Sequence, residues 1–165
     1  YLADKLGKKE IAGQYTQKAK EMAVEWERMA NDGDHYKLTF DKSGTWSQKY
    51  NLVWDKLMNW QIFPEQIVKT EIPYYLTKQN RYGLPLDNRQ TYTKTDWIMW
   101  TATLAPDKAT FEEFIEPVYL FMNETTDRIP MSDWVFTDKP EHRAFQARSV
   151  VGGYFIKMLE NKMNN

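Results

Sequence analysis

The sequence predicts an all-α domain, and three observations support that fold class. Apolar residues recur at helical spacing along most of the chain, and clusters of Gly, Pro, Asn and Asp separate these periodic segments. Only residues 35–40 suggest a short extended segment. The 165 residues suit a single domain, with no internal boundary visible across 1–165. We therefore expect roughly six or seven helices joined by loops.

Composition excludes several classes of function. Lys plus Arg (22) and Asp plus Glu (23) nearly balance, which favours neither nucleic acid nor an anionic membrane as a partner. Cysteine is absent, so disulfides, thiolate metal sites and a cysteine nucleophile are excluded. With two histidines and no calcium-loop motif, the sequence predicts no metal and no cofactor. No apolar run approaches the ~20 residues needed to span a bilayer.

The N-terminal half is predicted to hold a long helix between two shorter ones. One helix ends near Gly7, and the next runs from Lys8 to Ala30. Thr45 and Gln48 match a capping box, which predicts a helix over residues 45–57. The long helix carries an apolar stripe at the 3.6-residue period, made of Ile11, Tyr15, Ala19, Met22, Trp26 and Met29.

The C-terminal half is predicted to hold four helices, of which Pro73 and Pro117 would kink two. Thr93 and Asp96 form a second capping box at the start of one of these helices. The long polar loops are expected to gather at one end, where a site can form. The predicted helices span residues 64–78, 93–104, 106–122 and 142–162, and the long loops span 31–45, 79–93 and 123–141.

The segment from Tyr82 to Trp97 is the richest in side chains that carry chemistry. Asp87 and Arg89 are close enough to pair and stiffen the loop, and the alternative is that they bind a substrate. Asp96 falls in the first turn of a predicted helix, where the helix dipole favours a carboxylate, and we weigh this equally with a catalytic role. A nucleophilic Thr93 assisted by Lys94 is less favoured, because adjacent residues on a helix point in different directions.

A second segment extends from Pro130 to Gly153. Asp133 stands beside Trp134, and an apolar ring can raise the pKa of a carboxyl group toward that of a general acid; more often such a residue caps a turn. The Gly152-Gly153 pair suggests that another helix or a ligand approaches closely. Arg148 is one turn away and either faces the same cleft or pairs with a neighbouring helix.

A third segment contains His35 next to Asp34. This histidine is either an acid–base group near neutral pH or, as we favour, a residue that holds a loop carbonyl.

Several of these motifs, in this order, resemble the C-terminal part of the glutaminase A-like family. The resemblance rests on GTWSQKYNLVWDKL, YGLPLDNRQTYTKTDW and PMSDW followed by FQARSVVGG, and it extends over nearly the whole chain, from Leu2 to Leu159. It implies helical hairpins that form about half of an (α/α)6 toroid, similar to the catalytic toroids of six-hairpin glycosidases. It also implies a longer protein that is exported, and so an extracellular or periplasmic location.

The first functional hypothesis, implied by the resemblance, is hydrolysis of L-glutamine to L-glutamate and ammonia. Arg89 or Arg148 would bind the substrate carboxylate. Lys94, Tyr92 and Trp134 complete the expected substrate-binding set. The candidate catalytic residues, which would bind the amino group or position water, are Asp87, Asp96 and Asp133.

The second hypothesis is a glycoside hydrolase or a sugar-binding domain. Acidic, aromatic-rich loops on a toroid-like helix layout suggest it. Asp87 or Asp96 would act with Asp133 across a cleft, about 6.5–9.5 Å apart in an inverting enzyme. In either case the expected partners are a small-molecule or sugar substrate and the remaining part of the same full-length protein. The exposed helix faces of half a toroid would otherwise favour a homo-oligomer, and the fragment alone is expected to be inactive or dimeric.

Overall fold

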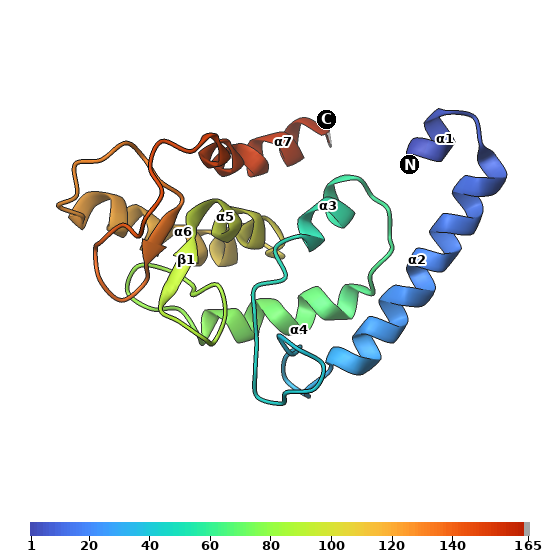
Figure 1. Cartoon of the computed structure of the whole chain (residues 1–165), viewed down its shortest axis with the longest axis horizontal. Coiled ribbons are helices and arrows are strands. Elements are labelled where there is room, and N and C mark those ends of the chain that lie inside the picture. Colours follow the sequence, from blue (N-terminus) through green and yellow to red (C-terminus); the bar gives the residue numbers. More distant parts are fainter. Residues whose placement is uncertain (164–165) are drawn as a thin grey trace.

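The computed structural model describes residues 1–163 and confirms the all-α class (Figure 1). Two three-residue strands are the exceptions to the helical architecture within that range. None of its helices is long and apolar enough to cross a membrane. The elements are α1 (Leu2–Lys5), α2 (Lys9–Ala30), α3 (Leu52–Leu57), α4 (Glu65–Leu76), β1 (Tyr92–Lys94), α5 (Thr95–Thr103), α6 (Lys108–Glu124), β2 (Trp134–Phe136), the 3-10 helix η1 (Ser149–Phe155) and α7 (Ile156–Met163).

Helix α5 lies at the centre of the packing. It contacts α6, η1, α7 and α3, and its residues Ile98 and Ala102 are fully buried. Phe114 of α6 and Ile67 of α4 belong to the same apolar cluster, which extends to Val53 of α3. Burial of these side chains supplies the main stabilising free energy of the domain. In Figure 1, α4, α5, α6 and α7 form one body, and α2 runs along its edge.

Helix α2 is confirmed at nearly the predicted bounds, but most of its apolar stripe is exposed. Tyr15 is 72% exposed and Met22 is 63% exposed, whereas Ala23 and Ala30 are the buried residues of the helix. Trp26 packs against residues of the core cluster. The helix therefore touches the body through its C-terminal half and a narrow face.

The capping box predicted at Thr45 is wrong. Helix α3 begins at Leu52, and the Thr45 hydroxyl instead donates to the Lys42 carbonyl. The Gln48 amide points away from any helix start, because it donates to the carbonyls of Leu84 (3.1 Å) and Pro85 (3.0 Å). A long-range contact thus displaces the local cap.

The second predicted capping box is also wrong. Thr93 lies in β1, which pairs antiparallel with β2 so that Lys94 faces Trp134. Its buried hydroxyl accepts a hydrogen bond from Gln48 (3.2 Å), and α5 starts two residues later with Lys94 as an N-cap that makes no side-chain cap bond. Asp96 does occupy the first turn of α5, as predicted.

The last predicted helix is confirmed only over its C-terminal part. Residues 142–148 form no helix, because His142 bridges Val135 and the Arg143 amide donates to the Trp134 carbonyl (2.8 Å). The chain thereby adds to the edge of β2 before η1 and α7 begin. The Gly152-Gly153 pair predicted a close approach, and the structure shows one at Gly153 of η1, where a Cβ would lie 2.9 Å from Trp100 Nε1 of α5. A Cβ at Gly152 would face open space.

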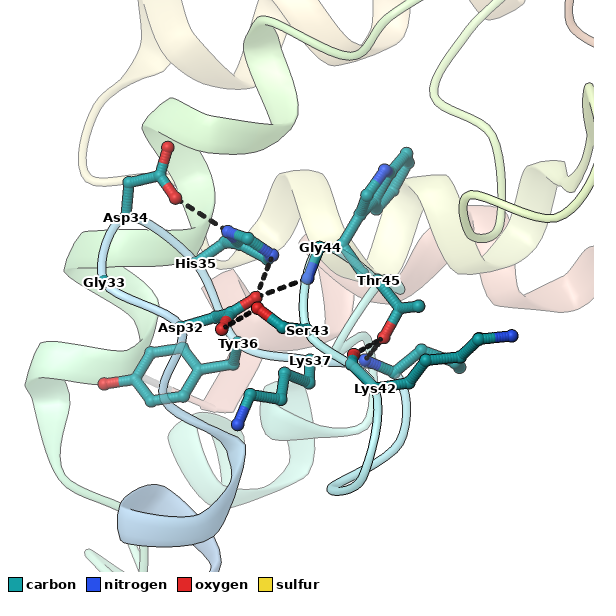
Figure 2. A network of polar contacts seen from close by, with 12 residues as sticks. Asp32, Gly33, Asp34, His35, Tyr36, Lys37, Lys42, Ser43, Gly44 and Thr45 are labelled. Carbon is teal, nitrogen blue, oxygen red and sulfur yellow. Dashed lines mark hydrogen bonds and ion pairs between the residues drawn. The ribbon is translucent and has the colours of Figure 1, made fainter.

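The loop at 31–45 is held by a polar network (Figure 2). The Asp32 carboxylate accepts hydrogen bonds from the Ser43 hydroxyl (2.7 Å) and the Gly44 amide (2.6 Å). His35 lies between Asp32 and Asp34, with 2.7 Å from its Nδ1 to the Asp34 carboxylate. Its ring also stacks on Tyr74 of α4. The side chain of His35 therefore contacts carboxylates and not the expected backbone carbonyl, and it fastens the loop to α4.

Candidate active site

The candidate site forms where β1 and β2 meet the N-terminus of α5. The pairing of the two strands joins the loops at 79–93 and 123–141, which lie far apart in sequence. The Asp133 carbonyl accepts hydrogen bonds from the Thr95 amide (2.8 Å) and from its hydroxyl (3.1 Å). These bonds hold Asp133 against the first turn of α5, next to Asp96.

Asp96 is the most chemically distinctive residue of this group. Its side chain is buried, and its Oδ1 atom has no hydrogen-bond partner among residues 1–163. Burial, followed by the negative charge of Asp133, raises its pKa to about 6; the amides of the first turn of α5 and the charge of Lys94 act in the opposite direction. A carboxyl group of this kind exchanges a proton near neutral pH.

Asp133 is equally buried but is paired with two cations. Its Oδ2 atom accepts from Lys94 Nζ (2.8 Å) and from Arg148 Nη1 (3.2 Å), and its Oδ1 has no partner within the described chain. The structure thus brings together four of the predicted site residues: Lys94, Asp96, Asp133 and Arg148. Arg148 therefore forms an ion pair with Asp133. Of the two roles that the sequence left open for Arg148, this is the pairing role.

Helix η1 packs against the first turns of α5 and contacts this group. The Tyr154 hydroxyl forms a 2.5 Å hydrogen bond with the Thr95 hydroxyl. Burial raises the pKa of Tyr154 to about 12, so the phenol stays protonated. The charges of Asp96 and Asp133 act in the same direction, and the hydrogen bond with Thr95 acts against them. Gly153 lets η1 approach α5, because a Cβ there would lie 3.1 Å from that of Asp96.

Asp87 and Arg89 lie in a separate cleft. Arg89 donates to Asp87 through Nε (2.9 Å) and Nη2 (2.6 Å), which confirms the predicted pair. The cleft has a volume of about 390 Å³, and the stacked rings of Tyr50 and Trp97 form part of its wall. Trp97 follows Asp96 in α5, so the cleft and the Asp96 group lie on neighbouring parts of one helix.

Tyr92 and Trp134 face each other across the two strands. Their rings meet edge to face at 5.4 Å, and Lys94 Nζ lies 4.6 Å from the centre of the Trp134 ring. The Arg143 guanidinium contacts both rings as well. Aromatic faces of this kind stabilise cations, so the rings position the charged groups of the site.

Sequence reasoning missed three residues that shape the site: Gln48, Arg143 and Tyr154. Gln48 links the loop at 84–93 to α5, since its Oε1 accepts from Thr101 (3.0 Å). Each of the three acts through a contact with a distant part of the chain, which no local pattern reveals. The glycine pair was the one sequence signal near Tyr154. No group of three or more His, Cys, Asp or Glu side chains is placed to hold a metal ion in residues 1–163.

Comparison with known proteins places these features in a family. The model of the glutaminase A six helical-hairpin domain matches residues 1–158. Glutaminase A of Aspergillus oryzae is 27% identical over 165 aligned residues, which cover 96% of this chain and 24% of that protein. A probable glutaminase of Arthroderma benhamiae is 26% identical, with 86% of this chain and 20% of that protein covered.

The chain therefore spans about a quarter or less of the curated relatives that it matches. No solved structure matches it. The family model covers nearly the whole chain, including the strands, α5 and η1 that build the candidate site. The chain belongs to the glutaminase A six helical-hairpin domain family.

Proposed function

We propose that this domain forms part of a hydrolase that converts L-glutamine to L-glutamate and ammonia, with Asp96 as its general base and acid. The observation that carries the proposal is the buried Asp96 carboxyl group, whose pKa is raised to about 6 and whose Oδ1 atom has no partner within residues 1–163. The names of the two fungal relatives support the choice of substrate.

The proposed reaction needs one group that accepts and then returns a proton. The Asp96 carboxylate takes a proton from a water molecule as the water oxygen attacks the amide carbon. The carboxylic acid then gives this proton to the departing nitrogen, so that ammonia leaves and glutamate forms. Lys94 and Arg148 supply positive charge near the oxyanion, and Asp133 holds them in place.

The test is ammonia release from L-glutamine near neutral pH, measured on this chain and on the complete gene product. Changing Asp96→Asn should lower kcat by roughly 10²–10⁴-fold, because general acid–base catalysis contributes that much. Asp41→Asn, at an exposed loop carboxylate, is the matched control and should leave the rate unchanged. Absence of ammonia above background from the complete gene product, or full activity of its Asp96→Asn variant, would exclude the proposal.

A glycoside hydrolase or carbohydrate-binding domain is the second candidate function. The cleft beside Asp87 supports it, because half-buried Tyr50, Trp97 and Trp26 line a volume of about 390 Å³. Flat apolar rings with a few polar groups suit a small-molecule ligand. Release of reducing sugar from a panel of glycosides, without release of ammonia, would favour this candidate over the first.

We also infer that the domain works within a longer, exported protein in an extracellular or periplasmic location. Its relatives are four to five times longer than the matched region, which supports a larger functional unit. The partner would then be the rest of the same polypeptide. Cell fractionation with an antibody against this domain tests the location.

A further inference from the structure

Within residues 1–163, one arginine of the site differs from the others in having no acceptor for its side chain. Of the six arginines in the sequence, five donate side-chain hydrogen bonds within the described residues. Arg143 donates none there, and its buried Nε atom has no partner. The five are Arg28 with Glu25, Arg81 with Glu124, Arg89 with Asp87, Arg128 with the carbonyls of Thr125 and Asp127, and Arg148 with Asp133.

Aromatic rings, and not an anion, hold the Arg143 guanidinium. Its Cζ lies 4.6 Å from the centre of the Tyr92 ring, 4.9 Å from that of Trp134 and 5.6 Å from that of Phe136. The backbone amide of Arg143 is fixed to the Trp134 carbonyl at 2.8 Å. The guanidinium therefore has a defined position and free donors, which is the state of a preorganised anion-binding group.

The carboxylates of the site and of the neighbouring turn do not bond to the Arg143 side chain within residues 1–163. Lys94 and Arg148 share the single carboxylate of Asp133. Of the other carboxylates in this part of the chain, Glu141 pairs with Lys139 and Asp127 with His142, and Asp138 is exposed in the turn after β2. None of these carboxylates bonds to the Arg143 guanidinium within residues 1–163, so its donors remain available to an anionic ligand.

We propose that Arg143 is the group that binds a carboxylate of the ligand. The ligand is an α-amino acid, and its α-carboxylate meets the guanidinium. Only this choice of ligand rests on the proposed function. The two arginines expected from the sequence to do this are already occupied: Arg89 forms a bidentate pair with Asp87, and Arg148 bonds to Asp133. Arg143 needs no such bond to be broken before a ligand binds.

The test measures binding without turnover. The probes are L-norvaline, which has the backbone of glutamine and no amide to hydrolyse, and n-butylamine, which lacks the carboxylate and also has no amide. Calorimetric titration of the chain should show at least about tenfold tighter binding of L-norvaline, as expected for a charge-assisted hydrogen bond. Arg143→Gln should abolish this preference, and Arg143→Lys should retain part of it. The Arg143 Nε–H signal in NMR spectra should move when L-norvaline is added.

Arg28→Gln, at an exposed paired arginine of α2, is the matched control and should keep the full preference. Circular dichroism of Arg143→Gln excludes unfolding as the cause of a loss, and Arg143→Lys provides a second variant that keeps the charge. An unchanged preference in Arg143→Gln, or equal or absent binding of the two probes by the unmodified chain, would overturn the inference. A carboxylate preference without ammonia release would overturn only the proposed glutaminase activity, whereas ammonia release without the preference would overturn only this inference.

Discussion

At the scale of single residues, the chemistry of the site depends on which charges are paired and which are not. Asp87 and Asp133 each hold at least one cation within 3 Å, whereas no ion pair to Asp96 is found in residues 1–163. The pairing of Asp87 with Arg89 was one of two alternatives open from the sequence, because opposite charges two residues apart in a loop can reach each other. The raised pKa of Asp96 depends on burial by η1 and on Asp133, and neither is visible in the local sequence.

The pKa of Asp96 leads to a prediction about stability. Because the pKa is raised from 3.8 to about 6 in the folded protein, the folded state holds the proton more tightly than the unfolded chain does. The contribution of Asp96 is thus most favourable in acid and is lost as pH rises from about 4 to about 6. Asp96→Asn removes the buried charge, so we expect it to raise the free energy of unfolding by on the order of 2 kcal/mol at about pH 8.

This gain should shrink toward zero below about pH 4, where the native carboxyl group is already neutral. Urea unfolding of both proteins at several pH values measures it. Asp41→Asn again serves as the control, because that exposed residue should give no pH-dependent difference. A stability difference that is independent of pH would show that Asp96 is not the titrating group.

At the scale of elements, the periodicity of apolar residues predicted long helices well and helix starts poorly. The helices α2, α4 and α6 have nearly the predicted bounds. The starts failed at Thr45 and Thr93, since both capping patterns are local and both are overridden by bonds involving Gln48. The strands were missed because three residues are too few for a pattern, and their pairing joins positions about 40 residues apart.

The approach of η1 to α5 gives a prediction at this scale. Gly153→Ala would place a methyl group 2.9 Å from Trp100 Nε1 and 3.1 Å from the Cβ of Asp96, so η1 would have to move. We expect a loss of about 1–3 kcal/mol in the free energy of unfolding, typical of overpacking. The pKa of Asp96 should fall at the same time, because the displaced helix no longer shields it. Urea unfolding and NMR titration measure the two effects.

Gly152→Ala is the matched control one residue earlier. A Cβ at Gly152 meets nothing within 4 Å, so the same substitution should be neutral or stabilising by about 0.4–1 kcal/mol. Equal effects of the two substitutions would mean that backbone freedom, and not the contact with α5, explains the glycine pair.

At the scale of the whole molecule, the all-α class was predictable and the arrangement of the helices was not. The class follows from periodicity, but the central place of α5 depends on contacts with η1 and α7, which lie far along the chain, as well as with the neighbouring α6. The expected half toroid stays a prediction. One consequence of it is visible in α2, where Ile11, Tyr15 and Met22 present a largely exposed apolar stripe. A face of this kind suits a further helix of a longer polypeptide or a second copy.

The exposure of α2 gives a prediction for the chain on its own. Isolated helices gain little stability in water, and α2 contacts the body through Trp26, Ala23 and Ala30 while its first half contacts mainly α1. We therefore expect backbone amides in residues 10–20 to exchange hydrogen far faster than those of α5, in the same sample and by the same mass-spectrometric measurement.

Changing Ile11, Tyr15 and Met22 together to Lys should alter the free energy of unfolding by about 0.5 kcal/mol or less per site while reducing any self-association seen in sedimentation. The complete gene product provides the comparison: if another helix covers this face there, protection of residues 10–20 should rise to that of α5. Equal protection of the two helices in the isolated chain would show that α2 is stabilised without such a partner.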